Sequence, residues 1–251
     1  MKLSSLSLLS VVSLVAFVGC GSPDPLAEFL GTQGVAHFGV TRSRGCTPQL
    51  ALFTPARPGC PVDRPLMTDV NESLAIDFES DPGAISVRSS DVGVVLVGEL
   101  RANDNRRTFN VDIRGVRAGV ASVEVLRANG AVLDTVRVEV ADAASMTIRP
   151  DADVQTPAMM SSDGSRVTVR PMQQGSLTAW VRDARGRQLF ANDGVQWTVA
   201  DTATMTVSWL TMGPSAVTDD RVYINGVRVG TTQLTARAGA VSRTITAEVA
   251  E

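Results

Sequence analysis

Two nine-residue stretches, VDIRGVRAG at residues 111–119 and VYINGVRVG at residues 222–230, decide the fold because they show that the chain repeats itself. Six of the nine positions are identical. The likeness continues beyond them, where Glu-Val-Ala at residues 139–141 matches Glu-Val-Ala at residues 248–250. The offset of about 110 residues is the size of one β-sandwich domain. We therefore expect two tandem domains of one fold.

Apolar and polar residues alternate within each copy, which is typical of half-buried strands. Residues 111–114 place Val and Ile on one face and Asp and Arg on the other, and residues 136–140 repeat the alternation. Gly115, Gly119 and the Asn129-Gly130 dipeptide mark the turns between these strands. No stretch keeps a helical apolar stripe, because Pro and Gly interrupt it. The sequence predicts an all-β fold.

The second copy carries a family resemblance. WTVAD at residues 197–201, MTV at residues 205–207 and VYINGVRVGTT at residues 222–232 resemble the group 2 bacterial immunoglobulin-like repeat. The first copy keeps the later part of this pattern, at residues 111–125, and lacks the Trp. The resemblance implies two immunoglobulin-like β-sandwiches with Trp197 in a core. It says little about function, because members of the family serve in adhesion, in spacing and as accessory modules of surface enzymes.

The N-terminus has the features of an export signal. Lys2 supplies a positive charge, and residues 3–18 form an uncharged run that is too short and too rich in serine for a membrane span. The run ends in FVGC at residues 17–20, which resembles the bacterial lipobox with Phe where the family usually has Leu. This resemblance implies cleavage before Cys20 and a lipid on its sulfur as the membrane attachment. The alternative is an ordinary secreted protein that buries Cys20. By the same resemblance, Gly21 rather than Asp after the Cys favours the outer membrane.

These features divide the chain into four parts. We predict a signal peptide at residues 1–19, a tether at 20–33, a first sandwich at 34–142 with a Cys-closed, Pro-rich N-terminal extension, and a second sandwich at 143–251. The join at residues 143–145 has little slack, so we expect the domains to lie end to end with limited freedom.

Two further cysteines, Cys46 and Cys60, remain as a pair in an exported protein, where disulfides persist. Closing a loop of ~15 residues contributes on the order of 3 kcal/mol in the chain-entropy model. A disulfide is the preferred interpretation. Zinc is the alternative, but a structural zinc site needs four ligands and the chain holds a single His.

Charge and the shortage of catalytic side chains restrict the function. The net charge is −3 and no long basic run occurs, so nucleic acid is not an expected partner. His37, the single histidine, would have to serve any Ser-His-Asp triad, and no Gly-x-Ser-x-Gly motif supplies a nucleophile. We expect His37 to lie on a strand with its ring toward solvent.

The remaining polar and aromatic clusters have a structural and a functional interpretation. Paired carboxylates could act on a glycosidic bond, Asp-x-Asp could bind calcium, tryptophans could stack on sugars, and a basic turn could meet an anionic surface. Solvated turns and core packing are the preferred interpretations. These candidates are Asp77/Glu79, Asp151/Asp153, Asp219-Asp220, Trp180, Trp197, Trp209 and Arg106-Arg107.

The sequence as a whole predicts a non-catalytic, lipid-anchored module of the cell envelope that binds or spaces, without a cofactor or resident metal. Its expected partners are the membrane, through Cys20, and an envelope protein or glycan. The alternatives are an enzyme or accessory protein acting on envelope polysaccharide, and a purely structural lipoprotein.

Overall fold

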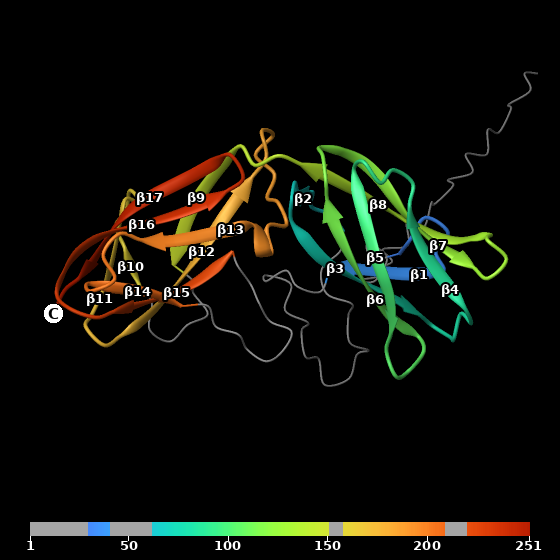
Figure 1. Ribbon diagram of the computed structural model, residues 1–251, viewed down its shortest axis with the longest axis horizontal. Coiled ribbons are helices and arrows are strands. Elements are labelled where there is room, and N and C mark those ends of the chain that lie inside the picture. Colours follow the sequence, from blue (N-terminus) through green and yellow to red (C-terminus); the bar gives the residue numbers. More distant parts are fainter. Residues whose placement is uncertain (1–29, 41–61, 151–157, 209–219) are drawn as a thin grey trace, which may run out of the picture.

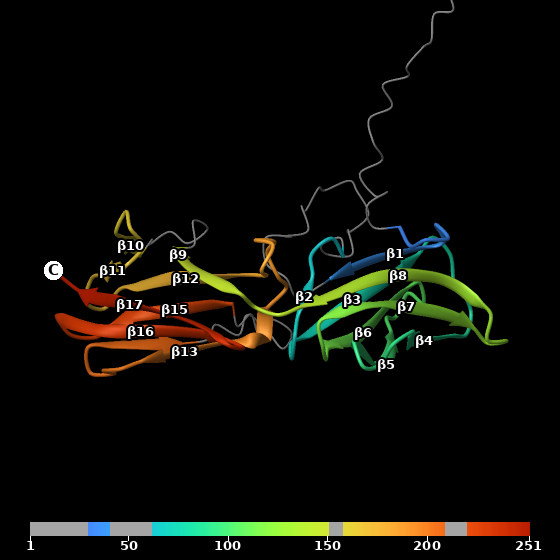
Figure 2. The same ribbon diagram turned by 90° about the horizontal axis from the view of Figure 1, so that it is seen from above.

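The computed structural model describes residues 30–40, 62–150, 158–208 and 220–251. These residues form two β-sandwiches that lie end to end, joined by the short stretch 142–144 (Figures 1 and 2). The regular elements are strands, apart from a single 3₁₀ turn, η2 (Asn192–Gly194), within the described ranges. The predicted all-β fold is confirmed.

The first domain packs two four-stranded sheets, in the orders β1-β3-β6-β5 and β2-β8-β7-β4. Neighbouring strands are antiparallel except β2 and β8, which are parallel. The strands are β1 (Ala36–Val40), β2 (Leu66–Met67), β3 (Asn71–Phe78), β4 (Ile85–Ser89), β5 (Val95–Ala102), β6 (Thr108–Gly115), β7 (Gly119–Arg127) and β8 (Val132–Ala141).

The second domain repeats this topology strand for strand. Its sheets have the orders β9-β12-β15-β14 and β10-β11-β17-β16-β13, with β10 as the one added strand and with β11 parallel to β17. Both domains have the two-sheet arrangement of an immunoglobulin fold. The strands are β9 (Ser145–Pro150), β10 (Met159–Met160), β11 (Arg166–Val169), β12 (Gln174–Arg182), β13 (Val195–Val199), β14 (Met205–Ser208), β15 (Arg221–Gly226), β16 (Gly230–Ala238) and β17 (Val241–Val249).

The sequence repeat has a packing reason at Gly115 and Gly226, which end the matching strands β6 and β15. A Cβ on Gly115 would lie 2.7 Å from the carbonyl oxygen of Met67, and one on Gly226 would overlap the carbonyl oxygen of Arg170. In each domain the backbone therefore passes so close to this strand end that only glycine fits. Both glycines precede the short turn that the sequence predicted.

Residues 30–33, placed in the tether by the sequence, are hydrogen-bonded to the first domain. The amide of Thr32 donates to the carbonyl of Thr135 at 2.9 Å. The buried carboxylate of Asp134 accepts hydrogen bonds from the amides of Gln33, Val35 and Ala36, each at 2.8 Å. This carboxylate holds the chain as it enters β1.

Candidate functional site: the joint between the domains

Several residues that the sequence singled out lie outside the described ranges. They are Cys20, Cys46, Cys60, Asp151, Asp153, Trp209 and Asp219. The lipidation, disulfide and calcium hypotheses therefore stay predictions. Among the residues that the structure does describe, no group of three or more His, Cys, Asp or Glu side chains is placed to hold a metal ion. Within the same ranges, no helix has the length and apolarity needed to cross a membrane.

His37 lies beside Asp77, which is its cross-strand partner on β3. Burial raises the pKa of Asp77, and a hydrogen bond with the Thr108 side chain and the charge of His37 oppose that rise. Asp77 thus stands between His37 and the hydroxyl of Thr108. A nucleophilic triad needs the imidazole between the hydroxyl and the carboxylate. This arrangement does not activate Thr108.

Trp197, Trp180 and Arg106-Arg107 do not form one site. Trp197 is 5% exposed and belongs to the core of the second domain, as predicted. Trp180 is half-buried on the outward side of β12, where the guanidinium carbon of Arg149 lies 5.4 Å from its ring centroid. Arg106 and Arg107 lie on the exposed β5–β6 turn, and Arg107 contacts the carbonyl of Glu79 at 3.4 Å.

Main-chain hydrogen bonds, buried apolar side chains and charged groups come together at the joint between the domains. We define it as β2 and its flanking residues 65–70, the 183–194 connection that leads from β12 to β13, Glu139 on β8 and Met146 on β9. None of these residues was proposed as a site from the sequence.

Main-chain hydrogen bonds form the centre of the joint. The amide of Met67 donates to the carbonyl of Phe190, and the amide of Phe190 donates to the carbonyl of Pro65, both at 2.9 Å. On its other side, β2 pairs with β8, with Leu66 opposite Val140. The strand β2 is therefore bonded to the first domain along one edge and to the second domain along the other.

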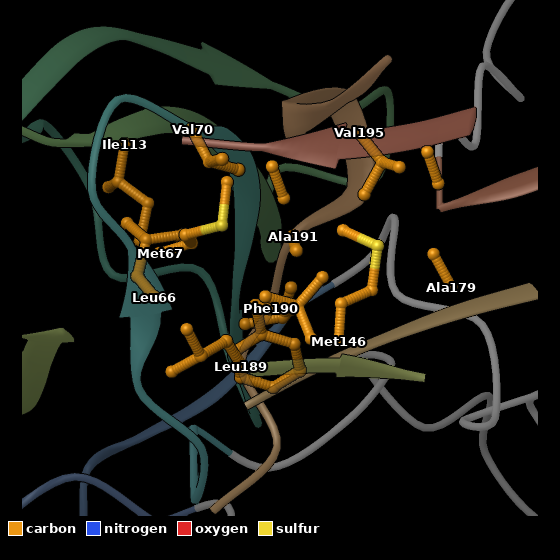
Figure 3. Packing of buried hydrophobic residues seen from close by; sticks show 14 of the residues in the cluster. Leu66, Met67, Val70, Ile113, Met146, Ala179, Leu189, Phe190, Ala191 and Val195 are labelled. Carbon is orange, nitrogen blue, oxygen red and sulfur yellow. The ribbon is translucent and has the colours of Figure 1, made fainter. Parts of the chain in front are cut away.

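Apolar side chains fill the space around these bonds (Figure 3). Leu66, Met67 and Val70 from the first domain meet the Leu189-Phe190-Ala191 run and Met146 from the second. All of these side chains are buried. A Cβ on Gly194 would overlap Val70 and lie 2.5 Å from the Met67 methyl carbon, so this glycine lets the two domains approach closely. The two cores form one continuous apolar cluster through this contact.

Charged groups close the joint at its rim. Arg187 donates from both terminal nitrogens to Glu139, at 2.6 and 3.0 Å, and from Nε to Asp183 at 2.9 Å. These bonds raise the pKa of Arg187. Asp193 accepts hydrogen bonds from the amide and the side chain of Asn71, at 3.0 and 3.1 Å.

Both carboxyl groups bound by Arg187 titrate below their ordinary values. The hydrogen bond from Arg187 is the main reason that the pKa of Glu139 is lowered. Burial favours protonation of Asp183, but hydrogen bonds from the amides of Arg187 and Arg185 and from the Arg187 side chain outweigh burial and lower its pKa. The contact between the domains therefore stabilises the ionised form of Glu139, whereas the ionised form of Asp183 is stabilised within its own connection.

One sequence signal points to the joint. The connection at residues 183–194 is longer than its counterpart at residues 79–84 in the first domain, and it carries the apolar run at 189–191 inside an otherwise polar turn. An apolar run within a long turn indicates a docked segment. The position of its partner, β2, does not follow from the sequence.

Comparison with solved structures finds bacterial surface proteins, while no family model and no curated protein matches the chain. Domains 4 and 5 of the S-layer protein SbsC are 20% identical, with 66% of this chain and 77% of that chain covered and a TM-score of 0.31. The Escherichia coli adhesin FdeC is 16% identical, with 75% and 62% covered and a TM-score of 0.30. Invasin, a bacterial integrin-binding protein, is 14% identical, with 74% and 38% covered and a TM-score of 0.29.

Proposed function

We propose that this chain is a non-catalytic, lipid-anchored protein of the bacterial cell envelope that serves as a stiff binding or spacing arm. The observation that carries the proposal is the joint, in which main-chain bonds, a buried apolar contact and a bidentate ion pair connect the two domains. Domains of one chain move relative to each other by default, unless their interface is large and apolar. A joint of this kind suits a protein that must hold a surface at a fixed distance and orientation.

The anchor in this proposal rests on the sequence at residues 17–20, and the outer membrane rests on Gly21. An acyl chain contributes about 0.8 kcal/mol per buried methylene, so the two or more chains of a lipoprotein anchor it stably. Metabolic labelling with a clickable palmitate, followed by membrane fractionation, tests this part. The full-length protein should take up label and sediment with outer membranes, and Cys20→Ser should lose both properties. A labelled Cys20→Ser variant would contradict the anchor.

The stiffness is tested on the secreted Cys20→Ser protein in solution. ¹⁵N relaxation should give one rotational diffusion tensor for amides of both domains, and small-angle scattering should fit a single elongated shape. Two independent tensors would contradict the proposal, since they would mean that the joint opens freely.

A further inference from the structure

The fold presents the same four-stranded sheet twice, so its two outer faces can be compared position by position. Leu74 pairs with Val111 in the first domain, and Leu177 pairs with Val222 in the second. This common register places Trp180 where the first domain has Asp77. The other matched positions, named with the first domain first, are Gly39 and Arg149, Glu79 and Arg182, Asn110 and Arg221, and Asp112 and Tyr223.

The two faces differ in their carboxylates. The first domain's face carries Asp77 and Asp112, with Glu79 directly after β3, and also the guanidinium groups of Arg101 and Arg114, of which Arg101 pairs with Asp112. In the second domain, the outward positions of the described strands β9, β12, β15 and β14 carry three arginines, two aromatic rings, amides and hydroxyls, and no carboxylate. Arg221 and Tyr223 are buried, so the arginines accessible on this face are Arg149 and Arg182. The chain as a whole has a net charge of −3, so this concentration of positive charge is local.

Two of these arginines are not neutralised by described carboxylates. Some exposed arginines elsewhere form ion pairs, as Arg88 does with Glu124 at 2.7 Å and Arg101 with Asp112 at 2.8 Å, while others, such as Arg117, form none with a described carboxylate. Arg149 and Arg182 have no such partner within the described ranges. Arg149 lies instead over the ring of Trp180, which fixes its guanidinium while its outer N–H groups stay available.

A hollow of about 400 Å³ adjoins this pair along the free edge of β9. Thr147 and Arg149 line it from β9, Ser161 and Ser162 line it from the turn after β10, and Arg243 lines it from β17. This volume falls in the range that holds a small ligand.

Among the described residues that line the hollow, Asp163 is the one carboxylate, and its own turn binds it in the ionised form. Asp163 accepts hydrogen bonds from the hydroxyls of Ser161 and Ser165, at 2.5 and 2.7 Å, which lower its pKa to about 2. The lining thus offers the guanidinium groups of Arg149 and Arg243 and several hydroxyls, against the single negative charge of Asp163.

We propose that the outer face of β9 and β12, together with this hollow, binds an acidic polysaccharide. Guanidinium groups bind carboxylate or phosphate substituents, hydroxyls match the hydroxyl groups of the sugar, and the Trp180 ring fixes the Arg149 guanidinium that meets the anion. The shared chemistry of the ligand is a glycan chain bearing anions. This inference deepens the proposed function by naming its ligand class, and it rests on neither the lipid nor the joint.

The test uses the secreted Cys20→Ser protein and isothermal titration with three probes: an alginate hexamer bearing uronates, a phosphomannan bearing phosphates, and neutral cellohexaose. At least one acidic probe should bind with an affinity that falls as salt rises, and cellohexaose should bind at least about tenfold more weakly. Comparison of the two acidic probes tells uronate from phosphate.

Variants locate the binding. Arg149→Glu and Trp180→Ala should each weaken binding of the acidic probe by about tenfold or more, since the first loses a charge-assisted contact and the second removes the ring that fixes the Arg149 guanidinium. Arg237→Glu is the matched control, because this exposed arginine lies on β16 in the opposite sheet. Its affinity should stay within about twofold of the parent. If Trp180→Ala does not fold, Trp180→Phe with Arg149→Gln carries the test.

Three results would overturn the proposal. The first is no binding of either acidic probe, and the second is an equal loss in Arg149→Glu and Arg237→Glu, which would show unspecific attraction. The third is self-association of the protein that Arg149→Glu abolishes while the glycans do not bind, which would make this face a contact between two copies of the chain. None of these results bears on the lipid or on the stiffness of the joint.

Discussion

At the scale of single residues, a few buried or paired charges organise the surfaces that matter. Asp134 is fully buried and bonds three amides of residues 33–36. Replacing it by Ala leaves those donors without an acceptor, so we expect a loss of about 3 kcal/mol in the free energy of unfolding of the first domain. Urea denaturation followed by circular dichroism measures this. Asp104→Ala, at an exposed turn, is the control and should change stability by less than about 0.5 kcal/mol.

The joint is expected to weaken in acid. Glu139, which Arg187 binds across the joint, has a lower pKa in the folded protein than its ordinary 4.5. The folded state therefore binds fewer protons at Glu139 than the unfolded state does, and the contribution of this group is complete above that value and is lost as the pH falls below about 4. Relaxation measurements should show one tensor at pH 7 and growing independence of the domains toward pH 3. Arg187→Ala should already be loose at pH 7, and a joint in this variant as stiff as in the parent would contradict the assignment.

Side-chain types were readable from the sequence, but their partners were not. Trp197 was expected in the core because it occupies the core position of the family that the chain resembles, and it is buried there. Trp180 was named as an alternative sugar platform, yet the stacking of Arg149 on it depends on the register of β9 against β12. No short-range pattern sets that register, because β9 has neither a hairpin connection to β12 nor a distinctive motif.

At the scale of elements, the repeat and the two-residue alternation were sufficient to predict both sandwiches, because inward and outward positions report directly on which face of a sheet is buried. The joint was not predicted from the sequence, because most of the residues that form it do not belong to strands with alternating apolar and polar residues. They connect a two-residue strand, β2, to a turn more than a hundred residues later. The expected limited freedom at residues 143–145 was a statement about length alone, without the docked 183–194 connection.

The matched glycines give a prediction for strands. Gly226→Ala should destabilise the second domain by roughly 1–3 kcal/mol, because the new methyl group would overlap the Arg170 carbonyl, a backbone atom that cannot rotate away. Thermal unfolding by calorimetry measures the loss. Gly93→Ala is the control, since the nearest atom to its Cβ belongs to the Asp91 side chain, at 3.2 Å. Equal melting temperatures for the two variants would mean that the backbone near Arg170 can move away from residue 226 at little cost.

At the scale of the whole molecule, stiffness should depend on a single glycine. Gly194→Val places a branched side chain against Val70 and Met67, so we expect the joint to open while both sandwiches stay folded. Small-angle scattering should then show a broader distribution of interdomain distances, and amide spectra should change mainly near β2 and residues 183–194. Ala184→Val is the matched control, because Ala184 is an exposed position of the same connection. If the joint of Ala184→Val were as mobile as that of Gly194→Val, the effect would not be specific to the contact of residue 194 with Val70 and Met67.

The parallel pairing of β2 with β8 has a mechanical consequence. Along the chain, β2 lies near the entrance of the first domain and β8 at its exit, and β11 and β17 repeat this arrangement. If the N-terminal end is anchored by lipid as proposed, tension between that end and a ligand on the second domain would pull β2 and β8 in opposite directions along their common axis. Their main-chain hydrogen bonds would then share the load in shear rather than break one after another, and the Phe190 contacts would carry part of the force across to the next domain.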